Sequence, residues 1–100
     1  MNLCEFTAYW PGEYSNEEIE TYTPIFGDEK TQWPASESYS DIIIDIERVV
    51  RINPAKDAGH VTVDLADGLA ITIAMPYNDF KNVLSINGIQ ITSYKKWHTT

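Results

Sequence analysis

A hairpin between Val61 and Ile73 constrains the fold of this 100-residue chain more than any other stretch. Apolar residues occupy every second position on both sides of the turn at residues 66–68, namely Val61, Val63 and Leu65 before it and Leu69, Ile71 and Ile73 after it. A three-residue loop with Gly68 in the left-handed conformation places Val63 opposite Ile71, whereas a two-residue loop places Asp64 there. Burial of the apolar face therefore predicts the three-residue loop.

The dipeptide Asn87-Gly88 predicts a second hairpin, because it is the strongest short signal for a two-residue turn between strands. Such a turn pairs Ile86 with Ile89 and Leu84 with Ile91 on one face. Both hairpins are apolar on one side only, so they indicate a scaffold and not an active site. Between them, the segment 76–81 predicts one helical turn with Asn78 as its cap.

The amino-terminal part contains a strand and a helix start. Residues 3–10 alternate in polarity and end at Pro11-Gly12, which predicts a strand. Ser15 and Glu18 have the spacing of a capping box, which favours a short helix from there. Thr and Tyr in the following residues favour a strand equally, so helix and strand both remain open for residues 16–26.

Residues 41–53 fit both a helical stripe and a strand face. Seven of these thirteen residues are Ile or Val, whose branched side chains pack better on a pleated sheet than on a helix. We therefore predict a long strand, with a bulge near Arg48 as an option. Residues 27–40 lack any period and predict a long loop around Trp33-Pro34.

These elements predict a mainly β fold of the β-rich α+β class. We expect an antiparallel sheet of about six to seven strands, as a sandwich or partly open barrel, with one or two short helices. The length allows a single domain over residues 1–100. An exposed edge strand such as residues 3–10 is free to pair with a target or with a second copy, as a homodimer.

The cysteine content and the hydropathy favour a cytoplasmic protein. Cys4 is the single cysteine, so an internal disulfide is excluded. The amino terminus lacks the basic start and apolar run of a secretion signal, and no stretch approaches the roughly 18 apolar residues of a membrane span. We expect no contact with membranes.

Charge is divided unevenly along the chain. Residues 1–40 hold eight acids against the single base Lys30, so they carry -7 of the net charge of -8. The same forty residues hold eight of the twelve aromatic residues. Aromatic side chains anchor interfaces, and acids accelerate association with a basic surface, although such residues also fill cores and cover ordinary surfaces. We select as partner-binding candidates Glu13, Tyr14, Glu17, Glu18, Glu20, Asp28, Glu29 and Trp33.

This distribution predicts a small inhibitor that occludes the basic surface of a protein partner, such as a nuclease or a nucleic-acid-binding complex. A phage-encoded anti-defence protein, for example an anti-CRISPR, and an immunity protein against a toxic nuclease both work in this way. Direct binding of nucleic acid is disfavoured, because only seven Lys and Arg residues are present. The alternative is a carbohydrate-binding or phage structural β-module with exposed Trp10 or Trp33.

Catalytic and cofactor motifs are absent from the sequence. It contains no glycine-rich phosphate loop, nucleophile elbow or HExxH motif. Two histidines and one cysteine make a poor zinc-ligand set, and acids alternating along strands are the usual pattern of a solvated face. We expect neither an enzyme nor a protein with a metal or cofactor.

Overall fold

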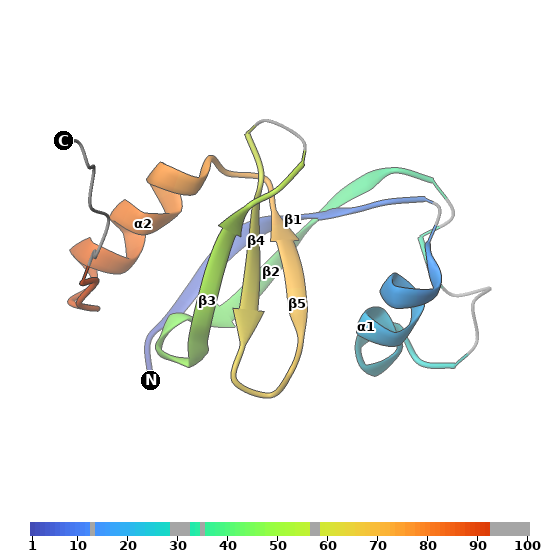
Figure 1. The fold of residues 1–100 in the computed structure, drawn as a ribbon, viewed down its shortest axis with the longest axis horizontal. Helices are drawn as coiled ribbons and strands as arrows, with labels where there is room; N and C mark the ends of the chain where they lie inside the picture. Colours follow the sequence, from blue (N-terminus) through green and yellow to red (C-terminus); the bar gives the residue numbers. More distant parts are fainter. Residues whose placement is uncertain (13, 29–32, 35, 57–58, 93–100) are drawn as a thin grey trace, which may run out of the picture.

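The computed structural model describes residues 1–12, 14–28, 33–34, 36–56 and 59–92. Within this part of the chain, five strands form one antiparallel sheet, which is flanked by two α-helices (Figure 1). In chain order, the elements are β1 (Leu3–Trp10), α1 (Asn16–Phe26), β2 (Ser38–Asp45), the 3₁₀ turn η2 (Ile46–Arg48), β3 (Val49–Pro54), β4 (Val61–Leu65), β5 (Ala70–Ile73) and α2 (Tyr77–Ile86). The β-rich α+β class is confirmed. Neither the predicted number of six to seven strands nor the predicted sandwich or barrel is confirmed, since the described residues form five strands in one sheet.

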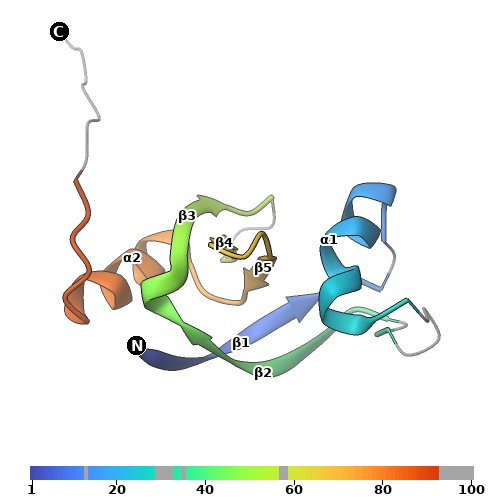
Figure 2. The same ribbon diagram turned by 90° about the horizontal axis from the view of Figure 1, so that it is seen from below.

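The strand order β2-β1-β5-β4-β3 makes two consecutive strands, β2 and β3, the opposite edges of the sheet. At about 4.8 Å per strand, the edges of a flat five-stranded sheet lie roughly 19 Å apart. The connection η2 has only three residues, which span roughly 6 Å in a 3₁₀ turn. The sheet must therefore curl, and Figure 2 shows β1 and β2 crossing beneath β3, β4 and β5.

Residues 41–53 form strands, as predicted, but they belong to two strands, β2 and β3, and not to one long strand. Asp45 accepts a hydrogen bond from the backbone N–H of Glu47 and caps η2, which interrupts the strand after residue 45. A register shift between Val49 and Arg51 leaves Val50 as the extra residue in the pairing with β4. The predicted bulge near Arg48 thus corresponds to a turn at Arg48 followed by a bulge at Val50.

The β4–β5 hairpin has the predicted register. Val63 pairs with Ile71, and Val61 pairs with Ile73. The N–H of Leu65 donates to the carbonyl of Leu69 at 2.8 Å, and Gly68 closes the loop with φ of 90°. Burial of Val61, Val63, Ile71 and Ile73 confirms that the apolar face selects the loop.

The predicted second hairpin is wrong, because Leu84 and Ile86 belong to α2 and Asn87-Gly88 ends this helix. The N–H of Gly88 donates to the carbonyl of Ser85, and the N–H of Ile89 donates to the carbonyl of Leu84. These two bonds, with Gly88 at φ of 82°, form a Schellman motif. Glycine after asparagine thus serves a helix end as well as a hairpin turn. The helix begins after Pro76, so Asn78 is not its cap.

Residues 16–26 form a helix, which settles the alternative left open by the sequence. The predicted capping box is present: the Ser15 hydroxyl accepts from the N–H of Glu18, and the Glu18 carboxylate accepts from the N–H of Ser15. Pro24 lies inside the helix near its end. Tyr22 and Phe26 hold the helix by packing edge-on against Trp10 at the end of β1.

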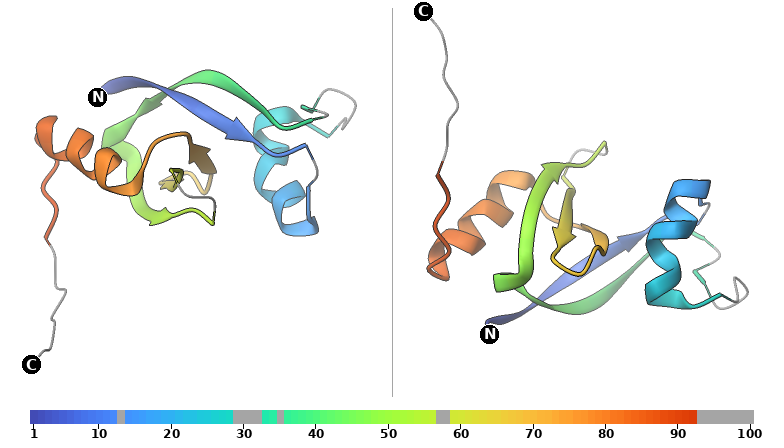
Figure 3. Two further views of the ribbon diagram at one scale, coloured as in Figure 1. Left: turned by 90° about the horizontal axis from the view of Figure 1, so that it is seen from above. Right: turned by 60° about the horizontal axis from the view of Figure 1, so that its bottom comes forward.

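The two helices pack at opposite ends of the molecule (Figure 3). Phe80 of α2 is fully buried, and its ring centroid lies 5.1 Å from that of Phe6 in β1. The core joins them through buried residues of four strands and η2: Ala8, Ile44, Ile46, Val61, Val63, Ile71 and Ile73. Strand β1 lies between β2 and β5 and is not an edge, so the edge predicted at residues 3–10 is instead β2.

Candidate functional site

The predicted acidic candidates gather on and beside α1. Glu17 and Glu20 are exposed on the helix, whereas Glu18 is partly buried at its cap. Asp28 is exposed two residues after the helix. Glu13 and Glu29 lie outside the described residues. The structure therefore brings together three of the predicted acids on one short helix.

The two predicted aromatic anchors lie inside an aromatic cluster formed by Trp10, Tyr14, Tyr22, Phe26 and Trp33. Trp33 is only 5% exposed, its Nε1–H donates to the carbonyl of Gly27 at 3.0 Å, and its ring meets that of Tyr14 edge-on. The Tyr14 hydroxyl contacts the carbonyl of Pro34 at 3.3 Å. Trp33 thus holds the chain after α1 against the helix and does not present an exposed ring.

Burial also affects the ionisation of this cluster. Desolvation raises the pKa of the Tyr14 phenol, and the negative charge of Glu18 raises it further. Burial likewise raises the pKa of Tyr22, while a hydrogen bond with the Thr72 side chain acts in the opposite direction. Both phenols therefore remain neutral donors over a wider pH range than a solvated tyrosine.

A hollow of about 460 Å³ lies between the start of α1 and the side of the sheet that faces away from the core, here called the outward side. Its lining is rich in hydroxyl groups and carboxylates, and it consists of Tyr9, Pro11, Ser15, Glu17, Glu18, Tyr22, Ala55, Lys56, Thr62 and Thr72. Carboxylates surrounded by hydroxyl groups suit a guanidinium or ammonium group as a guest. Lys56 also lines the hollow, and its ammonium group would compete with such a guest for the same carboxylates.

Tyr9 connects this hollow to the outward side of β1 and β2. Its hydroxyl donates to Glu37 at 2.7 Å, and its ring lies 5.4 Å from that of its cross-strand partner Tyr39. Further along the same side, Thr7 pairs with Asp41, and Glu5 pairs with Ile43. We call Glu5, Glu17, Glu18, Glu37, Tyr39 and Asp41, grouped around Tyr9, the acidic surface.

The sequence reasoning missed Glu37 and Tyr39 because residues 27–40 were predicted to be a loop, and it placed Asp41 in a strand without selecting it as a site residue. Tyr39 and Ile43 are exposed by 53% and 64%, so this side offers apolar contact area beside its carboxylates. The sequence does contain a signal for this surface, because Tyr39, Asp41 and Ile43 occupy alternate positions. In a strand, they lie on the face opposite to Ile42 and Ile44. Extending the strand prediction towards Ser38 would have found it.

His60 packs against the acidic surface as a structural side chain. Its ring lies 5.1 Å from that of Tyr9 and 6.2 Å from that of Tyr39. Among the described residues, no group forms a hydrogen bond with its two buried ring nitrogens. The ring supports Tyr9 and Tyr39 from the β4 side.

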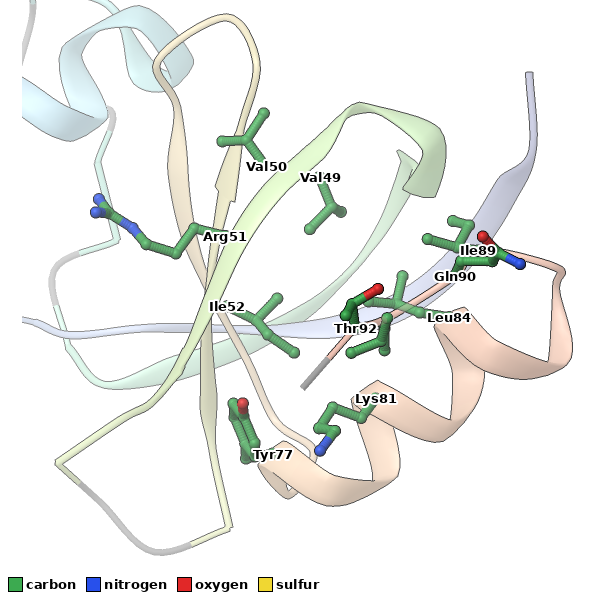
Figure 4. A pocket seen from close by; sticks show the side chains of 11 residues that line it. Val49, Val50, Arg51, Ile52, Tyr77, Lys81, Leu84, Ile89, Gln90 and Thr92 are labelled. Atoms are coloured by element: carbon green, nitrogen blue, oxygen red, sulfur yellow. The ribbon is translucent and has the colours of Figure 1, made fainter. Parts of the chain in front are cut away.

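A second hollow, of about 400 Å³, separates β3 from α2 (Figure 4). Apolar side chains line most of it, and Lys81 of α2 lies beside them, whereas the Arg51 side chain extends from β3 away from α2. Arg51 is paired with Asp64 at 2.7 Å, and Lys81 lies 5.7 Å from the ring centre of Tyr77. The sequence reasoning missed this groove because it depends on α2, which was predicted as half of a hairpin.

Residues 1–12, 14–28, 33–34, 36–56 and 59–92 contain no group of three or more His, Cys, Asp or Glu side chains placed to hold a metal ion. In these ranges neither helix has the length and apolar character needed to cross a bilayer. No family model matches the chain, and neither a curated protein nor a solved structure matches it.

Proposed function

We propose that this chain is a non-enzymatic inhibitor that binds the basic, nucleic-acid-handling surface of a partner protein in the cytoplasm. One observation carries the proposal. The acidic surface holds five carboxylates, those of Glu5 in β1, Glu17 and Glu18 in α1, Asp41 in β2 and Glu37 just before β2, and the elements β1, α1 and β2 contain no Lys or Arg. An immunity protein and a phage anti-defence protein such as an anti-CRISPR are the two settings that use this mechanism.

The geometry supports contact with a cationic protein through two features. The carboxylates of the acidic surface are spread over one helix and two strands, so they match a broad basic surface better than a single point charge. Exposed Tyr39 and Ile43 lie beside them and supply the apolar area that stabilises a complex after electrostatic attraction has formed it. Trp10 and Trp33 are each 5% exposed, so neither offers a ring face for stacking on a sugar.

The test uses capture of partners from a lysate of the native host at low and at high salt. The immobilised protein should retain a nucleic-acid-handling partner at low salt and release it at high salt, because the Debye length falls from about 10 Å at 0.1 M to about 3 Å at 1 M. Added duplex DNA or RNA should compete with the chain for that partner. Retention of no basic protein at low salt would contradict the proposal.

Charge-reversed variants locate the contact. Glu17→Lys and Asp41→Lys should each weaken capture, because they place a cation on the acidic surface. Asp79→Lys is the matched control, since Asp79 lies in the first turn of α2 and carries the same charge change at the other end of the molecule. Equal loss in all three variants would indicate dependence on net charge alone and not on this surface.

A further inference from the structure

Strand β2 is an edge of the sheet that contains neither a bulge nor a proline. Its eight residues pair with β1 in unbroken register from Ser38 to Asp45, and among the described strands it pairs with β1 alone. The opposite edge, β3, carries a bulge at Val50 and ends at Pro54. Bulges and prolines are devices that block the addition of a further strand. Of the two edges, β2 is therefore the open one.

An apolar groove runs beside β2 on the inward side of the sheet. Its volume is about 330 Å³, and its far walls are formed by Pro24 and Ile25 of α1 and by Leu69 and Ile71 of the β4–β5 hairpin. Asp45 and the ion pair between Arg48 and Asp67 also line it. Ile42 and Ile44 point to this side, because they share the parity that faces the core. A strand added to β2 would place every second side chain beside this mostly apolar groove.

The outward side of β2 has the opposite character. Tyr39, Asp41 and Ile43 alternate with the inward residues, and Asp41 is exposed. Side chains directly across a strand pair lie close enough for opposite charges to attract. A strand added to β2 would therefore place its other side chains beside a carboxylate and an exposed tyrosine, which favours Lys or Arg.

We propose that β2 binds an extended segment of the cationic partner by strand addition, and that apolar and basic residues alternate in this segment. The inference rests on the proposed function for the charge of the partner, and it adds the binding mode and the sequence pattern that is recognised. Backbone hydrogen bonds along β2 supply affinity, while the groove and the acidic surface supply specificity.

A synthetic eight-residue peptide of alternating Lys and Val tests the binding mode. We expect it to slow amide hydrogen exchange at residues 38–45. Two N-methylated forms of the peptide, methylated at alternate residues in the two possible sets, separate strand addition from charge attraction. Methylation of the set that faces β2 removes several backbone hydrogen bonds and should weaken binding about tenfold or more, whereas the other set should bind like the parent peptide.

Protein variants check the charge pattern. Asp41→Lys should weaken binding of the Lys-Val peptide and allow binding of a Glu-Val peptide, whereas Asp79→Lys should change neither. Equal binding of both N-methylated forms, or unchanged exchange in β2, would overturn strand addition. A chain that forms dimers in sedimentation, protects its own β2 amides and is not displaced by the peptide would assign the edge to a second copy instead.

The outcomes also separate this inference from the proposed function. If the Lys-Val peptide does not bind while capture of a basic partner still depends on Glu17 and Asp41, strand addition is wrong and the inhibitor proposal stands. If the peptide binds as expected and no basic partner is captured at low salt, β2 recognises strands but the inhibitor proposal fails. If both fail, neither proposal survives.

Discussion

Glu18 and Ser15 hold each other at the start of α1, through a 2.9 Å hydrogen bond from the Ser15 N–H to the carboxylate and a 3.2 Å bond from the Glu18 N–H to the hydroxyl. The carboxylate of Glu18 is thereby engaged in the fold, whereas that of the neighbouring Glu17 is exposed. These adjacent acids therefore have different roles.

We expect Glu18→Ala and Ser15→Ala each to lower the free energy of unfolding by about 1 kcal/mol, because each change leaves a backbone N–H of the first turn without its partner. Glu17→Ala should change it by less than about 0.5 kcal/mol, as is usual for an exposed residue. Urea denaturation measures all three. A larger loss for Glu17→Ala than for Glu18→Ala would contradict the assignment.

Asn87 and Gly88 offer a direct comparison between a helix end and a hairpin turn. Asn87 has φ of -89° and Gly88 has φ of 82°, so only the second position disfavours a side chain. Gly88→Ala should destabilise the protein by about 1–2 kcal/mol, whereas Asn87→Ala should cost about 0.5 kcal/mol, because it removes an exposed 2.7 Å hydrogen bond from Asn87 Nδ2 to the Val83 carbonyl. A two-residue type I′ turn needs positive φ at both positions. Chemical denaturation measures the free energy of unfolding of both variants. Comparable losses in the two would support a hairpin turn at these residues and contradict the helix end.

Gly12 lies against the backbone that leads into β2. A Cβ atom at this position would stand 2.5 Å from Cα of Ser36 and 2.8 Å from N of Glu37. Gly12→Ala should therefore cost about 1–3 kcal/mol by forcing the two segments apart. The Ser36→Gly change should not rescue it, since the clash involves backbone atoms. Thermal unfolding of the single and double variants gives the comparison.

Asp45 makes stability depend on acid pH. Hydrogen bonds from the backbone N–H groups of Asn2 first and Glu47 second hold the pKa of its carboxyl below the usual value, despite some desolvation. A depressed folded-state pKa contributes stability that is present above the unfolded pKa, near 3.9, and is lost as pH falls through the folded value. Asp45→Asn should flatten this part of the stability–pH curve. If stability falls with acid pH as steeply in Asp45→Asn as in the unchanged protein, Asp45 is not the source of this pH dependence.

The parts of the fold that the sequence predicted are those decided by local patterns. Alternation with burial on one side identified β1 and the register of β4 with β5, and the spacing of Ser15 and Glu18 identified the start of α1. Each signal depends on neighbours within a few residues, so long-range packing does not override it.

The errors arose where one signal serves two structures. Asn87-Gly88 fits a type I′ turn and a helix end equally, and the choice depends on Phe80 and Leu84 packing on the core. The acids of α1 were selected from charge, but Tyr39 was assigned to a loop and Asp41 was placed in a strand without being selected, because only the pairing with β1 shows that both lie on the side of Tyr9. The burial of Trp33 likewise depends on contacts with Tyr14 and Phe26 that no spacing rule predicts.

The central position of β1 has a consequence for biosynthesis. This strand emerges from the ribosome before the other four strands of its sheet, yet its two neighbours are completed only at Asp45 and Ile73. A nascent chain that ends before Ile73 therefore exposes one flank of an apolar strand to any other polypeptide nearby. Translational pausing in that interval should increase aggregation, and chaperone demand should fall once β5 has been made.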